Sequence, residues 1–274
     1  GPKAAPAVEP LSQLLDVPEL RMPSLHALEA IGADSYSAVA QIAELLEHPD
    51  FFVRTGAVLT LGQIGCPLDK RDRTGRRLLS MHADIVVAPL LVALGDVFEP
   101  LAYDAAEMLS ALKSLADPAV PKAIIMLDDP SHRIRSAAMG LITGLGPLAS
   151  AAVPKLIEVH KNNPGDTRTL DSLASIGPAA AAAIPMLEES VAQQAPGSGQ
   201  ATAHYALFCI RGDDSDLRQM LDLLNNPEVT AGTKKYVVKL LNRLGAKAEM
   251  VENEIRHMLA AGTLADLEGD LKSF

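Results

Sequence analysis

The chain has 274 residues, of which 48% are hydrophobic and only 3% aromatic, and it contains no tryptophan. Its formal net charge of −10 excludes the broad basic surface that a nucleic-acid-binding protein needs to neutralise phosphates, so we expect no nucleic-acid partner. The longest apolar run, residues 85–94, is too short to cross a bilayer and contains Pro89, so we expect no membrane insertion. Composition therefore favours an aliphatic helical protein with neutral or basic partners.

The N-terminus does not reveal the compartment. Because Gly1-Pro2 resembles the stub left by a cleavage protease, we interpret residues 1–5 as an expression remnant or a disordered tail. The native N-terminus and the localisation stay open. We expect residues 6–274 to form a single domain, either alone or as part of a larger polypeptide or complex.

Glycine recurs after an aliphatic residue, with most intervals between 31 and 35 residues. The recurring positions are Gly32, Gly65, Gly146, Gly177, Gly212 and Gly245. A period of this length is typical of a solenoid, in which small helical units stack because none can bury its apolar face alone.

The predicted elements follow this period along the whole chain. Residues 6–15 read as a lone second helix, and helix pairs follow at 18–47, 49–94, 97–127, 129–162, 163–191, 196–225 and 227–261, with a capping tail at 264–274. In the unit 129–162, apolar residues recur at three- and four-residue steps until Gly146, and a second amphipathic stretch follows. We therefore predict an all-α, right-handed α-solenoid (superhelix) of about seven helix pairs.

The amino-acid sequences of these units resemble the HEAT repeat. Residues 50–54 (DFFVR), 131–138 (SHRIRSAA) and 152–156 (AVPKL) carry the resemblance, and the bacterial phycobilisome-lyase HEAT-like type is the most similar. The resemblance implies that Arg54 and Arg135 tie neighbouring units together through acids or carbonyls. It covers nearly the whole chain, but it specifies a fold that serves unrelated functions.

One segment departs from the period. Residues 66–81 exceed the regular spacing and contain five cations, Lys70, Arg71, Arg73, Arg76 and Arg77. Insertions in solenoids emerge as loops and often bind partners, and arginine is suited to bidentate contacts with carboxylates or phosphates. We predict partner binding here; the alternative is a solvated loop that pairs with the acidic body.

The second helices of the pairs offer a further binding surface, because we expect them to line the concave face. The residues expected to contact a partner there are Lys155, Glu158, Glu188, Glu189 and Arg218. The alternative is that these are the ordinary outward charges of any exposed helix.

Local motifs for catalysis or cofactor binding are not found in the sequence. Seven scattered histidines lack metal-binding spacing, and Cys66 and Cys209 lie in different units, so we expect no metal, no cofactor and free thiols. Arg211-Gly212-Asp213 reads as a helix end, a turn and the cap of the next helix rather than as an adhesion motif.

These observations favour a non-catalytic scaffold, not an enzyme, that binds a protein or peptide through its concave face or the basic loop. The alternative, which the family resemblance implies, is a bilin lyase-like enzyme or chaperone acting on a tetrapyrrole-bearing protein. Nine aromatic residues in the whole chain count against a bilin site. A HEAT-like DNA glycosylase is disfavoured by the acidic charge and the lack of tryptophan.

Overall fold

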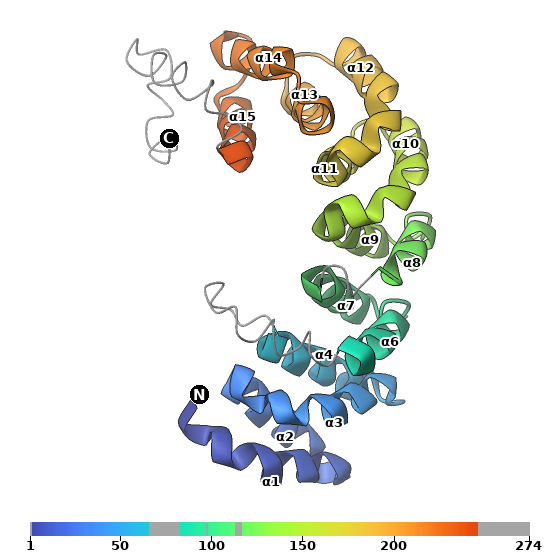
Figure 1. Ribbon diagram of the computed structural model, residues 1–274, viewed down its shortest axis with the longest axis vertical. Helices are drawn as coiled ribbons and strands as arrows, with labels where there is room; N and C mark the ends of the chain where they lie inside the picture. Colours follow the sequence, from blue (N-terminus) through green and yellow to red (C-terminus); the bar gives the residue numbers. More distant parts are fainter. Residues whose placement is uncertain (1, 66–82, 97, 113–116, 246–274) are drawn as a thin grey trace. The chain divides into compact units, whose positions relative to one another are not determined.

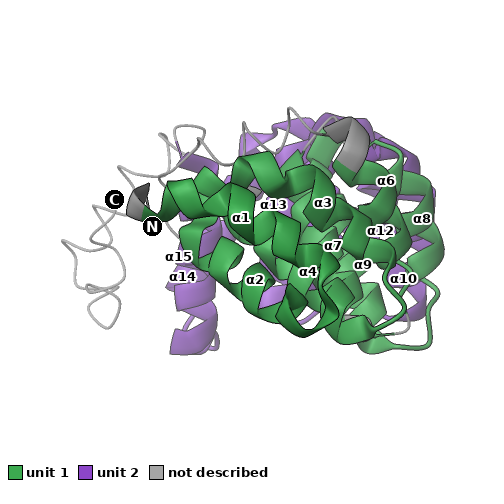
Figure 2. Ribbon diagram, turned by 90° about the horizontal axis from the view of Figure 1, so that it is seen from below, with its two compact units in different colours: residues 1–148 green, residues 149–274 purple. Residues whose placement is uncertain are grey.

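The computed structural model describes residues 2–65, 83–96, 98–112 and 117–245, and these form α-helices and 3-10 helices with no strand among them (Figure 1). The predicted all-α fold class, an α-solenoid of HEAT-like helix pairs, is confirmed. The chain divides into two compact units, Gly1–Leu148 and Ala149–Phe274, which Figure 2 colours separately. The basic insertion at 66–81 and the capping tail at 264–274 lie outside the described residues.

Unit 1 contains the first half of the repeats. Its elements are η1 (Pro2–Ala7), α1 (Val8–Gln13), η2 (Leu14–Asp16), α2 (Pro18–Ile31), η3 (Gly32–Ala38), α3 (Val39–Glu44), η4 (Leu45–Glu47), α4 (Phe51–Gly65), α6 (Ala83–Ala93), α7 (Glu99–Leu112), α8 (Ala119–Met126) and α9 (His132–Leu145). The first helices α2, α4, α7 and α9 pack side by side in chain order, and α3 packs on α6 in the layer of second helices (Figure 1). Aliphatic side chains such as Leu25, Leu61, Leu101 and Leu109 are fully buried in this unit.

Unit 2 continues the same pattern. Its elements are the second part of η6 (Gly146–Ala152), which crosses the boundary, α10 (Val153–Asn162), α11 (Thr167–Ile176), η7 (Gly177–Ala183), α12 (Ile184–Gln193), α13 (Ser198–Arg211), α14 (Asp214–Asn225) and α15 (Ala231–Leu244). Helix α13 packs against α11 and α15, which are also first helices, and against the second helices α12 and α14. The core is again aliphatic, as composition predicts.

The repeating glycines end helices. Among the described residues, positive φ angles occur at Gly32 (76°), Gly146 (59°), Gly177 (70°), Gly212 (70°) and Gly245 (54°). Side chains disfavour this left-handed region, so the chain uses glycine where a helix must stop and turn. Several helices then begin at a side-chain cap, because the oxygens of Ser131, Asp166, Asp213 and Thr230 accept hydrogen bonds from backbone N–H groups of the first turn.

Two stretches, His132–Asn162 and Thr167–Gln193, have the length and hydropathy of a membrane span. Each is interrupted by a positive-φ glycine, Gly146 or Gly177, and so consists of separate helices. In each stretch, 56% of the apolar window is buried inside the protein. These are the properties of core helices in a repeat protein.

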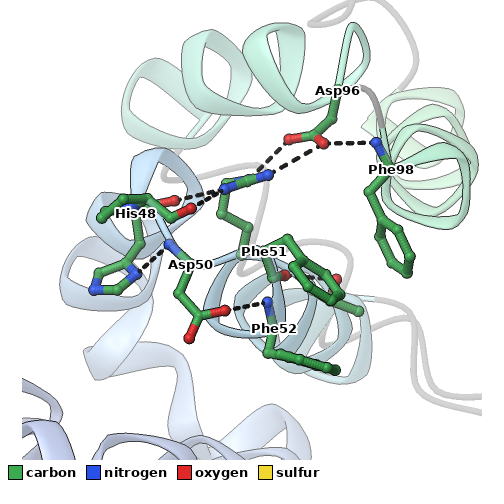
Figure 3. A network of polar contacts seen from close by, with 9 residues as sticks. His48, Asp50, Phe51, Phe52, Asp96 and Phe98 are labelled. Carbon is green, nitrogen blue, oxygen red and sulfur yellow. Dashed lines mark hydrogen bonds and ion pairs between the residues drawn. The ribbon is translucent and has the colours of Figure 1, made fainter.

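The arginines that the repeat resemblance singles out have the structural role it implies. Arg54 donates to the carbonyl oxygens of His48 and Pro49 at 2.8 and 2.9 Å and also binds the carboxylate of Asp96 (Figure 3). Arg135 donates to the carbonyls of Asp129 and Pro130. Each guanidinium binds the turn that precedes its own helix. The prediction that these arginines tie neighbouring units is confirmed for Arg54, whose partner Asp96 lies where the next unit begins, whereas the carbonyls that Arg135 binds belong to its own unit.

Candidate functional site

A groove in unit 1 lies over the first helices. It has a volume of about 690 Å³ and is formed by α4, α7 and α9 with one residue of α2. We refer to it as the unit-1 groove; its lining residues are Glu29, Val58, Leu59, Gly62, Gln63, Tyr103, Asp104, Ala106, Glu107, Met108, Ser110, Ala111, Ser136, Ala137, Gly140 and Leu141. This volume lies within the range of ligand sites.

Two large apolar side chains of the unit-1 groove are solvent-exposed. Leu59 of α4 is 44% exposed and Tyr103 of α7 is 41% exposed. Most of the other lining residues of α7 and α9 are small, namely Ala106, Ser110, Ala111, Ser136, Ala137 and Gly140. The groove therefore combines exposed apolar surface with a floor that a ligand backbone could approach closely.

Acidic side chains from two helices line the same groove. Glu29 comes from α2, and Asp104 and Glu107 come from α7. Burial, helped by the neighbouring charge of Glu107, raises the pKa of Asp104, although Arg133 acts in the opposite direction. Tyr103 donates a hydrogen bond to Glu107 Oε1 at 3.3 Å, and the negative charge of Glu107 is the main cause that raises the pKa of Tyr103. The groove thus has a negative wall.

Glycines within the first helices of unit 1 fall into two classes. A Cβ at Gly56 would lie 3.1 Å from Met22 Cε, and a Cβ at Gly144 would overlap Ser110 Oγ and lie 2.6 Å from Ser110 Cβ. These two glycines allow neighbouring helices to pack closely. Gly62 and Gly140 are different, because a Cβ there would meet no atom of the other described residues within 4 Å, apart from its own helix backbone.

Both of these open glycines line the unit-1 groove. A glycine inside a helix costs about 1 kcal/mol of stability relative to alanine. No neighbouring atom of the described chain requires Gly62 or Gly140 to lack a side chain. Their effect is to keep the groove open.

The partner-binding residues predicted on the second helices lie in unit 2 and do not line the unit-1 groove. On α10, Lys155 Nζ pairs with Glu158 Oε1 at 2.8 Å. On α12, Glu188 pairs with Arg211, and Glu189 accepts a hydrogen bond from Gln193. Arg218 is exposed on α14. The structure brings together only Lys155 and Glu158 of this set, and their partner-binding role stays a prediction.

A buried polar cluster, which the sequence analysis missed, lies at the Arg211-Gly212-Asp213 turn. The turn itself is as predicted: α13 ends at Arg211, Gly212 adopts a left-handed conformation and Asp213 caps α14. The side chain of Asp216 is only 2% exposed and accepts two hydrogen bonds from Arg211 and one contact from His204 Nδ1 at 3.1 Å. One feature of the sequence could have indicated this cluster: Asp216 lies on the apolar side of α14, four residues before the buried Met220.

No group of three or more potential metal-ligating side chains occurs in the part of the chain that the structure describes. The five basic residues Lys70, Arg71, Arg73, Arg76 and Arg77 fall within 66–82, outside that part, so their predicted role stays a prediction. The unit-1 groove is the candidate site that the described residues offer. No local sequence motif predicted this groove, because its lining residues are spread over four helices.

Comparisons with known proteins bear on the fold. No protein-family model matches the sequence, and no curated protein matches it. Among solved structures, the complex of CpcE and CpcF of phycocyanin lyase from Nostoc sp. PCC7120 is similar, with a TM-score of 0.51 and 18% identity over 84% of this chain and 94% of that chain. In fold, the chain is a HEAT-like helical-repeat protein. An engineered protein is also similar, with a TM-score of 0.50 and 16% identity over 85% of this chain and 97% of that chain.

The likeness to a lyase corrects one prediction. We expected a protein that is not an enzyme, and this is contradicted by the similarity to a phycocyanin lyase chain. The expectation rested on the lack of a local catalytic motif. In a repeat protein, however, successive helices bring residues that are distant in sequence to one surface, so a site needs no local motif.

Proposed function

We propose that this chain is a subunit of a bilin-lyase-like enzyme that acts on a tetrapyrrole-bearing protein. The unit-1 groove is the observation that carries the proposal, because it gives the fold shared with a phycocyanin lyase complex a place to hold a substrate. That lyase is a complex of two proteins, CpcE and CpcF. By analogy, we propose that this chain works with a protein partner.

The lining of the unit-1 groove favours the protein part of such a substrate. A free bilin carries propionate groups, which would meet the carboxylates of Glu29, Asp104 and Glu107. Among the described residues, the lining contains one aromatic side chain, Tyr103, and no lysine or arginine. A protein segment with neutral or basic side chains suits this surface better.

Two further sets of charged residues, both predicted from the sequence, are proposed to contact the substrate or the partner. The basic residues Lys70, Arg71, Arg73, Arg76 and Arg77 are suited to the carboxylates of a bilin or of an acidic partner. The charged residues Lys155, Glu158, Glu188, Glu189 and Arg218 of the second helices are proposed as secondary contacts with a protein partner.

A bilin-transfer assay tests the proposed function. Purified protein would be mixed with a linear tetrapyrrole and phycocyanin stripped of its bilin, and separately with intact phycocyanin. We expect the chain to change the rate or yield of covalent bilin attachment or removal, followed by visible absorption and by bilin fluorescence on denaturing gels. The same transfer with and without the chain, in both directions, would overturn the proposal.

A further inference from the structure

We propose that the unit-1 groove binds one basic, amphipathic α-helix of a partner protein. The inference deepens the proposed function and rests on it only for the identity of the partner, the tetrapyrrole-bearing protein. Its physical basis is the groove itself: open helical glycines, exposed apolar side chains and a wall of carboxylates within one unit.

The open glycines leave room for a close approach by a group beyond the described residues. Gly62 and Gly140 weaken their helices without relieving any contact in the described structure. The glycines at Gly56 and Gly144, in contrast, are explained by Met22 and Ser110. Small residues at a helix surface let a second backbone pack against it at short distance.

The backbone chemistry of the site favours a helix over an extended segment. The described residues contain no strand, so no sheet edge is offered to an added strand. The N–H and C=O groups of α4, α7 and α9 are already used within their own helices, and an extended peptide would leave its backbone groups unpaired on burial. A helix brings its backbone hydrogen bonds with it and fits the surface as a ridge packs into a groove.

The side chains that line the groove indicate which side chains the partner helix carries on each of its faces. Leu59 and Tyr103 present apolar surface and would contact its apolar face. Glu29, Asp104 and Glu107 would face lysine or arginine side chains along its polar edge, with Arg133 as the one cation that acts on Asp104. Glu29 and Asp104 are half-buried and Glu107 is exposed. A bound helix would cover these carboxylates, and basic side chains on that helix would offset the cost of removing them from water.

Fluorescence anisotropy with labelled model peptides tests this inference. The probe is an amphipathic peptide of about 15 residues, enough for some four helical turns, with leucine and alanine on one face and lysine and arginine on the other. The control peptide has glutamate at each basic position. We expect the basic peptide to bind at least about tenfold more tightly than the acidic one and to weaken several-fold as salt rises.

Variants separate groove binding from non-specific attraction. Gly62→Leu and Gly140→Leu fill the groove and should reduce affinity at least about tenfold, while thermal unfolding shows no loss of stability because leucine favours helix. Gly232→Leu is the matched control, because Gly232 is an exposed helical glycine of α15 that does not line the groove. Glu107→Lys should lower the affinity for the basic peptide and raise the affinity for the acidic peptide.

The results decide the inference either way. Equal binding of both peptides, or unchanged affinity in Gly62→Leu and Gly140→Leu, would overturn it, as would an equal loss in Gly232→Leu. The proposed function is tested independently: peptide binding without bilin transfer refutes the lyase role and leaves the groove assignment intact. Bilin transfer that persists in Gly140→Leu after peptide binding is lost would keep the groove as a helix site and refute the tetrapyrrole-bearing protein as its partner.

Discussion

The guanidinium of Arg54 donates two hydrogen bonds to the carboxylate of Asp96, from Nε to Oδ2 at 2.8 Å and from Nη2 to Oδ1 at 3.2 Å. Asp96 also accepts a hydrogen bond from the backbone N–H of Phe98 at 2.8 Å (Figure 3). The side chains of Arg54 and Asp96 are only 16% and 12% exposed. The pair therefore fixes the start of α7 to the start of α4 within unit 1.

Replacing Arg54 should destabilise unit 1. Arg54→Lys keeps the charge but loses the forked geometry, and we expect the free energy of unfolding to fall by about 2 kcal/mol. Arg135→Lys is the matched control, because Arg135 binds two carbonyls in the same way, and we expect it to cost about 1 kcal/mol. Urea unfolding measures both; equal losses would show that the Asp96 pair adds nothing.

The two classes of helical glycine should respond oppositely to alanine. Gly140→Ala adds a methyl group in open space and should raise the free energy of unfolding by about 0.5–1 kcal/mol. Gly144→Ala pushes against Ser110 and should lower it by about 1–3 kcal/mol. Thermal and urea unfolding give both values, and the same sign for the two variants would contradict the assignment of Gly140 to open groove surface.

The two acidic partners of Arg211 should differ in importance. Asp216→Ala leaves the charge of Arg211 without its buried partner and removes the contact to His204, and we expect a loss of about 3 kcal/mol. Glu188 is 54% exposed, so Glu188→Ala should cost less than about 1 kcal/mol because solvent screens the pair. Urea unfolding distinguishes the two variants; a larger loss in Glu188→Ala would contradict the prediction.

Acid should destabilise unit 2 through His160. The imidazole is 3% exposed; its Nε2 contacts Ser190 Oγ at 3.3 Å, and its Nδ1 has no hydrogen-bond partner among the described residues. Burial lowers the pKa of His160, although Asp166 acts against this shift. Because the folded state resists protonation, the stability that the neutral ring contributes is present above the unfolded pKa of about 6.5 and is lost as pH falls below it.

The test compares unfolding free energies of the parent and His160→Gln between about pH 7.5 and pH 5. We expect the parent to lose more stability on acidification than the variant does. His132→Gln is the control, because His132 is exposed at the start of α9, and it should follow the parent. Parallel curves for the parent and His160→Gln would refute the role of His160.

Much of the fold could be predicted because its determinants are local. A positive φ at Gly146, Gly177 and Gly212 depends on the residue itself, so the glycine spacing marks the ends of helices directly. The capping of α14 by Asp213 likewise involves neighbours in sequence. The role of Arg54 followed from the repeat resemblance, although its partner Asp96 did not.

The sequence by itself determined the helix pairs, their period and the glycines at which helices end. Helix propensity, apolar spacing and glycine conformation act over only a few residues. Only the tertiary structure decided which glycines face open space, that Asp216 is buried against Arg211, and that Glu29, Leu59, Tyr103 and Gly140 line one groove. These properties depend on which helices pack side by side, and no local pattern records them. The expectation that the protein is not an enzyme, which the likeness to a phycocyanin lyase contradicts, rested on the lack of a local motif, and a local motif cannot reveal a site that successive helices would assemble.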